Sequence, residues 1–135
     1  MTIDRVKKIT LPKITDNRGT LTFLESNHHL PFDIKRVFYL YDLTDNTMRA
    51  NHAHKTTQEF LVCLQGSFKV IVSDGQNQCQ FTLNSPDVGL YIPPLIWVKL
   101  SNFLPNSLCL AMADQIYNKD DYYRDYQEYC IAVNQ

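Results

Sequence analysis

Hydrophobic and polar residues alternate in short runs along most of the chain, and turn-forming residues separate these runs at near-regular intervals. The runs are rich in Val, Ile, Thr, Phe and Tyr, which suit a pleated sheet, so each is predicted to be a β-strand. Ser73-Asp74-Gly75, between two alternating runs, predicts a hairpin. The predicted strands are Ile3–Leu11, Thr20–Glu25, Ile34–Asp42, Met48–His54, Glu59–Leu64, Ser67–Ser73, Cys79–Leu83, Gly89–Ile92, Trp97–Leu100 and Leu108–Asp114. Such a series indicates an antiparallel sandwich or a closed barrel.

Only the tail of the chain changes character. Lys119–Val133 contains good helix formers and is predicted to be a C-terminal α-helix. The spacing of Tyr122, Tyr126 and Tyr129 places their rings on one face of that helix. We expect this aromatic face to pack on the barrel; the alternative is that one tyrosine reaches a ligand.

Size and charge exclude several classes of protein. The 135 residues suffice for one domain, so we expect a single domain over residues 1–135. The net charge of −1 argues against nucleic acid as a partner. No apolar run is long enough to span a membrane, and the first residues do not read as a signal peptide, so we expect a cytoplasmic protein with four reduced cysteines.

The densest chemistry lies between Arg49 and Gly66. His52, His54, Glu59 and Gly66 have the spacing H-x-H-x4-E-x6-G, which is the first cupin motif, although Asn46 replaces the usual leading glycine. Side chains alternate along a strand, so the two histidines are expected on one side. Arg49 would face the other way on an unbroken strand, and a bulge or strand end is needed to bring it into the same site.

These residues leave three interpretations open. His52, His54 and Glu59 can form a two-histidine, one-carboxylate triad for Fe(II). The second cupin motif would supply another histidine, but Val98 stands in that place, and valine cannot bind a metal. The other interpretations are two histidines hydrogen-bonded inside a polar pocket, and a histidine that acts as a general base.

Several stretches, in order along nearly the whole chain, resemble the sugar 3,4-ketoisomerases, which are cupin enzymes acting on dTDP-4-keto-6-deoxyglucose. The matching stretches are 16–21, 30–39, 52–55, 61–67, 89–92 with Pro94 and Trp97, and Tyr117 with Asp121, Tyr122, Arg124 and Tyr126. The resemblance implies an all-β, antiparallel cupin (jelly-roll) barrel with a short C-terminal α-helix, no metal or other cofactor, and a homodimer. The segment Thr2–Leu11 could pair with the partner's sheet edge.

The resemblance also implies a reaction. A base removes the proton at C3 of the 4-keto sugar, an enediol forms, and a proton returns to C4. The match points to His52 as the base, with His54 orienting it or moving the proton. A histidine is neutral and basic near pH 7, which suits this work. Tyr39 is a further catalytic candidate as a hydrogen-bond donor to the sugar, although it is equally suited to barrel packing.

The pyrophosphate of a dTDP-sugar calls for arginine, and the candidates are Arg18, Arg36 and Arg49. A surface ion pair with Asp33 or Asp42 is the alternative for Arg36. The resemblance to the more distant dTDP-4-dehydrorhamnose 3,5-epimerases places Arg18 and Glu25 at nucleotide contacts. The remaining substrate-binding candidates in the matching stretches or motifs are Lys55, Glu59, Tyr91 and Val98.

Two positions depart from the family pattern. Glu59 stands where the family usually has glutamine, and Val98 where it has histidine or arginine. Arg18 matches the members that form a 3-keto galacto (fucose-type) product, whereas Val98 matches neither kind. Arg18 therefore favours the galacto product. The leading hypothesis is a ketoisomerase of dideoxyaminosugar synthesis for surface polysaccharides such as lipopolysaccharide O-antigen. The alternatives are a non-catalytic dTDP-sugar-binding cupin and an Fe- or Mn-dependent cupin oxygenase.

Overall fold

The computed structural model describes residues 2–135, which fold mainly into antiparallel β-strands. Two 3₁₀-helices and one α-helix accompany the strands within these residues. In chain order the elements are η1 (Thr2–Arg5), β1 (Lys7–Thr10), β2 (Lys13–Asp16), β3 (Gly19–Thr22), β4 (Arg36–Leu40), β5 (Arg49–His54), β6 (Glu59–Gln65), β7 (Phe68–Ser73), β8 (Gln78–Leu83), β9 (Val88–Ile92), β10 (Trp97–Ser101), β11 (Leu108–Ala113), η2 (Lys119–Asp121), β12 (Tyr122–Tyr123) and α1 (Tyr126–Val133).

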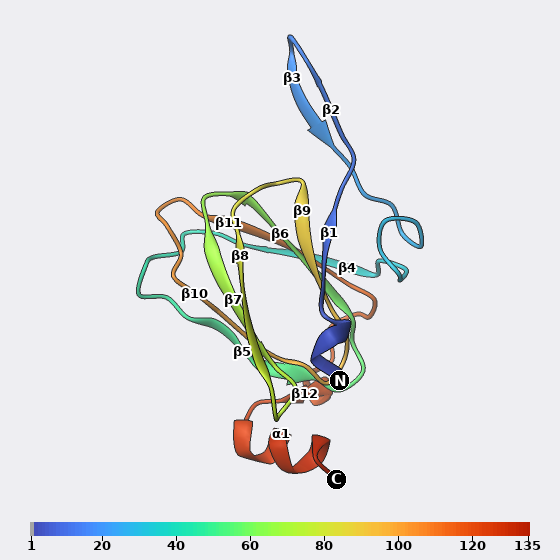
Figure 1. Cartoon of the computed structure of the whole chain (residues 1–135), viewed down its shortest axis with the longest axis vertical. Coiled ribbons are helices and arrows are strands. Elements are labelled where there is room, and N and C mark those ends of the chain that lie inside the picture. Colours follow the sequence, from blue (N-terminus) through green and yellow to red (C-terminus); the bar gives the residue numbers. More distant parts are fainter. Residues whose placement is uncertain (1) are drawn as a thin grey trace.

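The strands form two five-stranded sheets, in the orders β1-β9-β6-β11-β4 and β12-β5-β10-β7-β8. The apolar core lies between them and includes Phe68, Val70 and Val72 from β7 together with Leu61 and Leu90 from the first sheet. Helix α1 lies below one end of the sheets (Figure 1). The prediction of an antiparallel β structure with a short C-terminal helix is confirmed.

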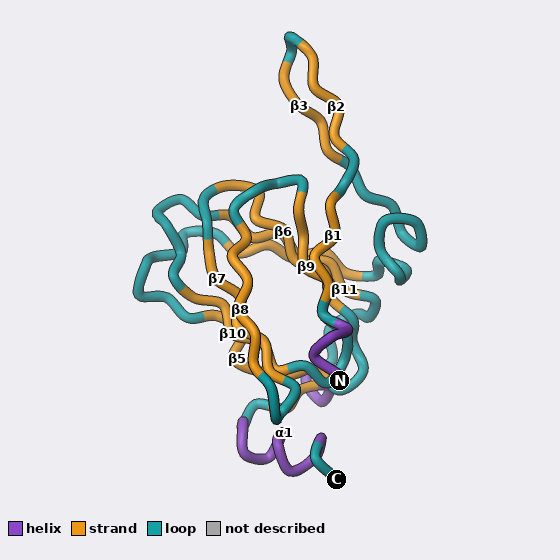
Figure 2. The backbone as a smooth tube through the Cα atoms, in the orientation of Figure 1, coloured by secondary structure: helices purple, strands orange, loops and turns teal. Residues whose placement is uncertain are grey.

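The β2–β3 hairpin stands apart from the two sheets. It forms a separate two-stranded sheet that projects beyond the end of the barrel opposite α1 (Figures 1 and 2). Apolar side chains on it remain exposed, including Ile14 at 59% and Leu21 at 57%. Strand β3 ends at Thr22, so the predicted strand Thr20–Glu25 was too long at its C-terminal end. Strand β2 was not predicted, because its four residues have no clear hydrophobic alternation.

The structure corrects the predicted N-terminal strand. Residues Thr2–Arg5 form a 3₁₀-helix, and only Lys7–Thr10 form a strand. This strand pairs with β9 of its own chain, with Lys7 opposite Tyr91 and Ile9 opposite Gly89. Strand β1 is therefore an edge strand of its sheet, with β9 on one side only, so its pairing with a partner stays a prediction.

The predicted C-terminal helix was also too long. Asn118 caps the short η2 helix, Tyr122 and Tyr123 pair with His54 and Ala53 as strand β12, and Asp125 caps α1. Tyr126 and Tyr129 pack against Trp97, with ring centroids 5.2 and 5.5 Å away. The Tyr129 hydroxyl lies within hydrogen-bond distance of the carbonyl oxygens of Ser73 and Leu95, so α1 is fixed to the barrel as expected.

Within residues 2–135, no helix combines the length and the apolar character that crossing a membrane requires.

The structure explains why the cupin motif ends in a glycine, Gly66. Gly66 has φ +85°, and a Cβ atom there would lie 2.3 Å from Ser107 Oγ and 2.8 Å from Ser107 Cα. That hydroxyl already accepts a hydrogen bond from the Ser67 amide and donates one to the Leu104 carbonyl. The turn after β6 therefore leaves no room for a side chain.

We expect Gly66→Ala to lower the free energy of unfolding by about 2–4 kcal/mol, because left-handed strain adds to the steric clash. Urea denaturation measures the change. Gly19→Ala is the matched control, since Gly19 also has a positive φ of 129° but open space around its Cβ position. We expect a loss of only about 1 kcal/mol there. Equal losses in the two variants would contradict the steric explanation.

Candidate active site

The site begins with an irregularity in β5. Val98 pairs with His52, but the next residue, Lys99, pairs with Ala50, so Asn51 is an extra residue. Ala50 and Asn51 both have left-handed backbones, with φ of 64° and 62°. The Trp97 indole donates a hydrogen bond to Asn51 Oδ1 at 3.2 Å, which holds the bulge in place. This bulge is the feature that the sequence required for Arg49 and His52 to share a site.

A small pocket of about 90 Å³ opens beside the bulge, inside the end of the barrel. Arg49, His52, Glu59 and Val98 contribute to its wall, as predicted for binding or catalytic residues. The remaining lining is mostly apolar and consists of Phe38, Leu40, Ala50, Leu61, Leu100 and Cys109. The pocket therefore offers one imidazole, one carboxylate and one guanidinium group in an otherwise apolar environment.

His54 does not line this pocket but lies behind it, between two acidic residues. Its Nδ1 is 3.2 Å from Asp121 Oδ2, and its Nε2 is 3.4 Å from Glu59 Oε2. All three side chains are buried. Burial by itself raises the pKa of Asp121, but hydrogen bonds from Thr56, Thr57 and His54 outweigh it, so this pKa lies below its usual value. Asp121 is thus a buried carboxylate that keeps its charge.

The environment of His52 is different. Its ring lies 5.3 Å from that of His54 and 4.8 Å from that of Tyr122, measured between centroids. Burial, together with the neighbouring His54 and Arg124, lowers the pKa of His52 from 6.5 to about 4, although Glu59 acts in the opposite direction. His52 is therefore neutral over the physiological range and has a lone pair available as a base.

Arg36 lies on the same face of β4 as the pocket-lining residues Phe38 and Leu40. The Arg36 guanidinium lies 5.4 Å from the Phe38 ring and 5.7 Å from the Tyr117 ring. Its Nε is buried without a hydrogen-bond partner in the described residues. No ion pair in that part of the chain involves Arg36, so the alternative of a pair with Asp33 or Asp42 is not observed.

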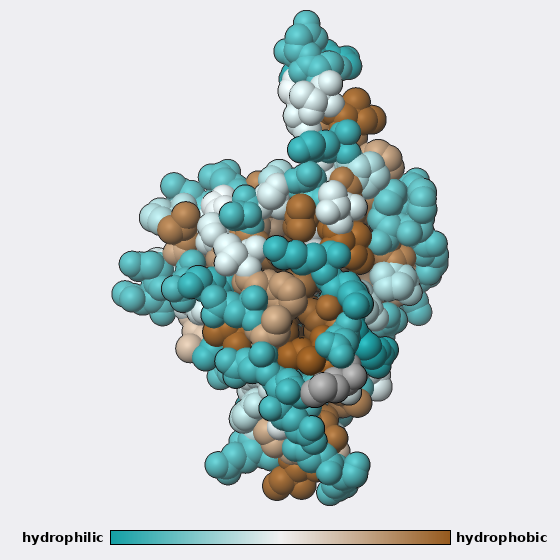
Figure 3. All heavy atoms as spheres, viewed as in Figure 1, coloured by the Kyte–Doolittle hydropathy of each residue, from teal (hydrophilic) through white to brown (hydrophobic). Residues whose placement is uncertain are grey.

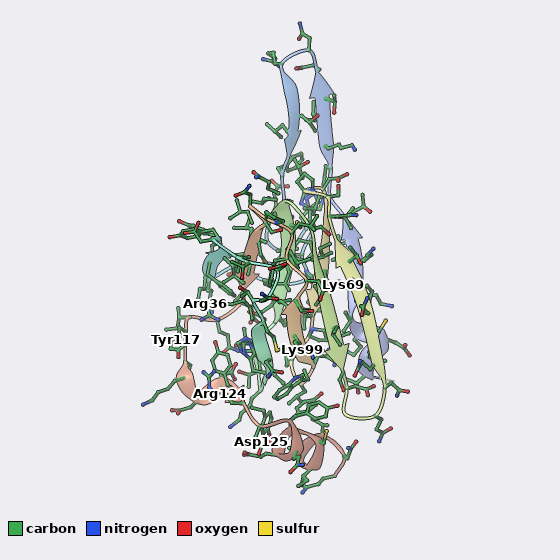
Figure 4. All side chains as sticks on the ribbon, turned by 90° about the vertical axis from the view of Figure 1, so that its left-hand side faces the viewer. Arg36, Lys69, Lys99, Tyr117, Arg124 and Asp125 are labelled. Atoms are coloured by element: carbon green, nitrogen blue, oxygen red, sulfur yellow. The ribbon has the colours of Figure 1, made fainter. Side chains whose placement is uncertain are left out.

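Arg124 was not among the predicted site residues. Its guanidinium stacks over the Tyr122 ring at 4.2 Å, and Tyr122 contacts both histidines. Figure 4 shows Arg36, Tyr117 and Arg124 along one side of the barrel. Asp121, Tyr122 and Arg124 were assigned to a helix from the sequence, which hid their contact with β5. The tyrosine that approaches the site is thus Tyr122, from a strand rather than from the predicted helix face.

Three predicted site residues lie elsewhere. Tyr39 is 60% exposed on the outer face of β4, because its neighbours Phe38 and Leu40 point into the pocket. Tyr91 packs in the outer cluster with Phe32 and donates a hydrogen bond to Gln58 Oε1. Lys55 lies over Tyr123, on the face of β12 that meets Tyr129 rather than the histidines. Strand alternation explains the positions of Tyr39 and Tyr91.

Two more predicted residues lie away from this chain's own pocket. Arg18 occupies the hairpin turn, where its guanidinium forms an ion pair with Asp16 at 2.7 Å. Its side chain is 86% exposed. Glu25 lies in the loop after the hairpin and contacts His28. The histidines of this loop, His28 and His29, have stacked rings, and Glu25 joins them in an exposed cluster.

The motif residues can also be assessed as metal ligands. Ligand atoms of His52, His54 and Glu59 all lie within 4.8 Å of one another. Two ligands bound to one ion at about 2.1 Å lie at most about 4.2 Å apart, so ligand atoms 4.8 Å apart would have to move closer to bind a cation together. Val98 lines the same pocket without a donor atom, so the fourth ligand of the second cupin motif is missing.

Comparison with known proteins gives the family. The family described as "FdtA: WxcM-like, C-terminal" matches residues 4–134. A TDP-4-oxo-6-deoxy-alpha-D-glucose-3,4-oxoisomerase from Aneurinibacillus thermoaerophilus is 41% identical over 131 residues, which are 95% of this chain and 94% of the relative. The chain belongs to the sugar 3,4-ketoisomerase family. This membership confirms the family predicted from the matching stretches.

Solved ketoisomerases have the same structure over nearly the whole chain. A 3,4-ketoisomerase from Helicobacter canadensis matches with a TM-score of 0.95 and 36% identity, over 97% of this chain and 98% of that one. An H→N variant of the enzyme from Thermoanaerobacterium thermosaccharolyticum, solved with TDP-4-keto-6-deoxyglucose, matches with a TM-score of 0.93 and 35% identity, over 96% and 94%.

The fold extends beyond the ketoisomerases. A dTDP-4-dehydrorhamnose 3,5-epimerase from Bacillus anthracis matches with a TM-score of 0.79 and 15% identity, over 90% of this chain and 79% of that one. An identity this low shows the fold alone. The prediction of a cupin barrel is confirmed.

We expect His52 to titrate with a midpoint near pH 4 rather than 6.5. Between these values the unfolded chain binds a proton that folded His52 does not, so stability falls as the pH is lowered through this window. NMR titration of the histidine signals measures the midpoint. Denaturation of wild type and His52→Asn at pH 7.5 and 4.5 measures the linkage, and the wild type should lose more stability. A midpoint near 6.5 would contradict the assignment.

Proposed function

We propose that this chain is a 3,4-ketoisomerase that converts dTDP-4-keto-6-deoxyglucose into a dTDP-3-keto-6-deoxyhexose. The observation that carries the proposal is His52, a neutral imidazole in a largely apolar pocket beside a buried carboxylate. A base of this kind suits removal of a proton next to a carbonyl group. Membership of the ketoisomerase family supports the choice of substrate.

The reaction follows from His52 and Glu59 in the pocket. His52 takes the C3 proton, the C–H electrons form a C3–C4 double bond, and the C4 carbonyl oxygen takes up the negative charge of an enediolate. We assign to the Glu59 carboxylate the transfer of the C3 hydroxyl proton to the C4 oxygen, which moves the negative charge to the C3 oxygen. The His52 imidazolium then returns its proton to C4, and the C3 oxygen becomes the new carbonyl. The sugar gains and loses equal numbers of protons, so no oxidant or reductant is consumed.

Three arginines are suited to the diphosphate of the substrate. Arg49 lines the pocket itself. Arg36 stacks on Phe38, which also lines the pocket, and Arg124 stacks on Tyr122, which contacts His52. The guanidinium fork matches phosphate oxygens in two-point hydrogen bonds, and stacking on a ring fixes its plane before the ligand arrives. We therefore expect the diphosphate to bind between β4 and the segment that follows β12.

We also propose that the chain forms a homodimer. An apolar groove of about 530 Å³ on the outer face of the first sheet is lined in part by Val37, Leu64, Leu110 and Met112. The hairpin stands clear of the body, with hydrophobic residues at its base (Figure 3). A two-fold arrangement in which each hairpin crosses to its partner would cover these residues and bring Arg18 toward the partner's substrate.

The compartment and the pathway proposed for the enzyme are those expected from the sequence. We expect the enzyme to act in the cytoplasm, a compartment that keeps its four free cysteines reduced. Its product is suited to dideoxyaminosugar synthesis for surface polysaccharides, because the new carbonyl at C3 is the group that an aminotransferase requires.

We expect the protein to exchange the C3 proton of dTDP-4-keto-6-deoxyglucose for deuterium in D₂O and to form a 3-keto product, as measured by proton NMR. His52→Asn should lower the rate by about 100-fold or more, since it removes the base. Ring couplings give the configuration at C4, for which Arg18 predicts galacto.

Controls for this experiment separate the alternatives. Dialysis against EDTA should leave the rate unchanged; loss of activity that Fe(II) or Mn(II) restores would support the metal-dependent cupin. Tight dTDP binding without exchange in the wild type would support the non-catalytic sugar-binding protein.

We expect Arg36→Gln and Arg124→Gln each to raise KM by about 10–100-fold with little change in kcat, because each variant removes a charged hydrogen bond to the diphosphate. Steady-state kinetics at constant ionic strength measures both constants. Lys69→Gln is the matched control, because it removes a cation from β7 at a position away from Arg36 and Arg124 (Figure 4). An equal rise in KM for Lys69→Gln would mean that only net charge matters.

We expect Val37→Lys to convert the dimer to a monomer, as measured by light scattering during size exclusion. Val37 is 55% exposed in the single chain, so the folded monomer should tolerate the charge, whereas a dimer interface should not. Ile131→Lys, at a 65% exposed position on α1, is the control and should leave the dimer intact. A monomeric wild type would contradict the proposal.

A further inference from the structure

The Asp121 carboxylate, which is buried outside the pocket, accepts hydrogen bonds at both of its oxygens. Asp121 Oδ1 accepts hydrogen bonds from the Thr56 amide at 2.9 Å and the Thr56 hydroxyl at 2.6 Å. Its Oδ2 accepts bonds from the Thr57 amide at 3.2 Å and the Thr57 hydroxyl at 2.5 Å, and contacts His54 Nδ1. These partners fix both oxygens. The proposed reaction gives Asp121 no step, so the structure needs another reason for its position.

The partner of Asp121 connects it to the pocket. Both nitrogens of His54 face carboxylate oxygens, Asp121 on one side and Glu59 on the other. The Nδ1 contact with Asp121 has hydrogen-bond geometry, and Nε2 approaches Glu59 at ion-pair distance. An imidazole N–H is attracted to such an oxygen, whereas a nitrogen lone pair is repelled by it. The Tyr122 ring packs against His54 with a centroid distance of 4.5 Å, and the Leu95 amide donates a hydrogen bond to the His54 carbonyl. The ring therefore has one orientation, which Asp121 selects.

The far end of this chain of contacts is the carboxylate that lines the pocket. Glu59 contacts His54 Nε2, and Glu59 is only 6% exposed. No other ion pair fixes Glu59 within the described residues. Without Asp121, the His54 ring can rotate or change the nitrogen that carries its proton, and Glu59 then loses its fixed contact.

We propose that Asp121 is a positioning residue of the isomerase: it orients His54, which holds the Glu59 carboxylate against the bound sugar. This inference rests on the proposed function, because it assigns Asp121 to the reaction through Glu59. Asp121 itself touches no reacting atom.

The first test is the kinetics of Asp121→Asn. We expect kcat to fall by about 100-fold, the loss typical when a reacting group is displaced, with KM changed by less than about threefold. Asp74→Asn is the matched control, because Asp74 also accepts several backbone hydrogen bonds, from Ile3, Gln76 and Asn77, but lies in the β7–β8 turn. It should lower stability and leave kcat unchanged. An Asp121→Asn enzyme with wild-type kcat would overturn the proposal, as would an equal loss of kcat in Asp74→Asn.

The second test needs no substrate. In ¹⁵N-labelled wild-type protein we expect the His54 Nδ1 signal of a protonated, hydrogen-bonded nitrogen, and in Asp121→Asn we expect that proton to leave Nδ1. If the wild type makes no 3-keto product but the signal moves as described, the proposed function is wrong and the contact is right. If the wild type is active and its Nδ1 carries no proton, the positioning role is wrong and the proposed function remains.

A milder variant covers the case in which Asp121→Asn fails to fold. Thr57→Val removes the hydroxyl that donates to Asp121 Oδ2, preserves the carboxylate and has a similar volume. We expect kcat to fall by about tenfold with KM nearly unchanged, which corresponds to one hydrogen bond to a charged group. An unchanged kcat in folded Thr57→Val would overturn the proposal.

Discussion

The site depends on a single break in the alternation of β5. Without the extra residue Asn51, Arg49 and His52 would lie on opposite faces of the strand. Two consecutive left-handed residues are costly, at about 1–2 kcal/mol each for ordinary side chains, so the surroundings must hold them. The Trp97 indole does so through Asn51, and the rings of Tyr126 and Tyr129 hold Trp97 in turn. The C-terminal helix thus stabilises the bulge that builds the pocket.

The two histidines of the motif have different surroundings. They are two residues apart on one strand, yet His52 faces a largely apolar pocket while His54 lies between the carboxylates of Asp121 and Glu59. Burial keeps His52 neutral, whereas His54 is fixed by its contacts with the two carboxylates. Environments that separate neighbouring ionisable groups in this way are how a protein assigns different tasks to the same residue type.

Most of the barrel could be predicted because hydrophobic alternation records which face of each strand is buried. The motif spacing likewise identified His52, His54 and Glu59, and Arg49 followed once a bulge was allowed. Alternation does not tell which face carries the pocket, so Tyr39 and Tyr91 were assigned to the site although both lie outside it. The segment around Asp121 was missed for a different reason. Its local sequence favours a helix, and only the contact with β5 makes Tyr122 and Tyr123 a strand.

The order of these elements along the chain affects how the protein is made. Strand β12 pairs with the edge of β5 at Ala53 and His54, and β12, Asp121 and α1 all follow the last strand of the first sheet, β11. While the ribosome is still adding these residues, β5 has unpaired backbone groups on its outer side. An open strand edge of this kind can pair with another chain. The late segment that carries Asp121 thus also protects part of the β5 edge from such pairing in the nascent chain.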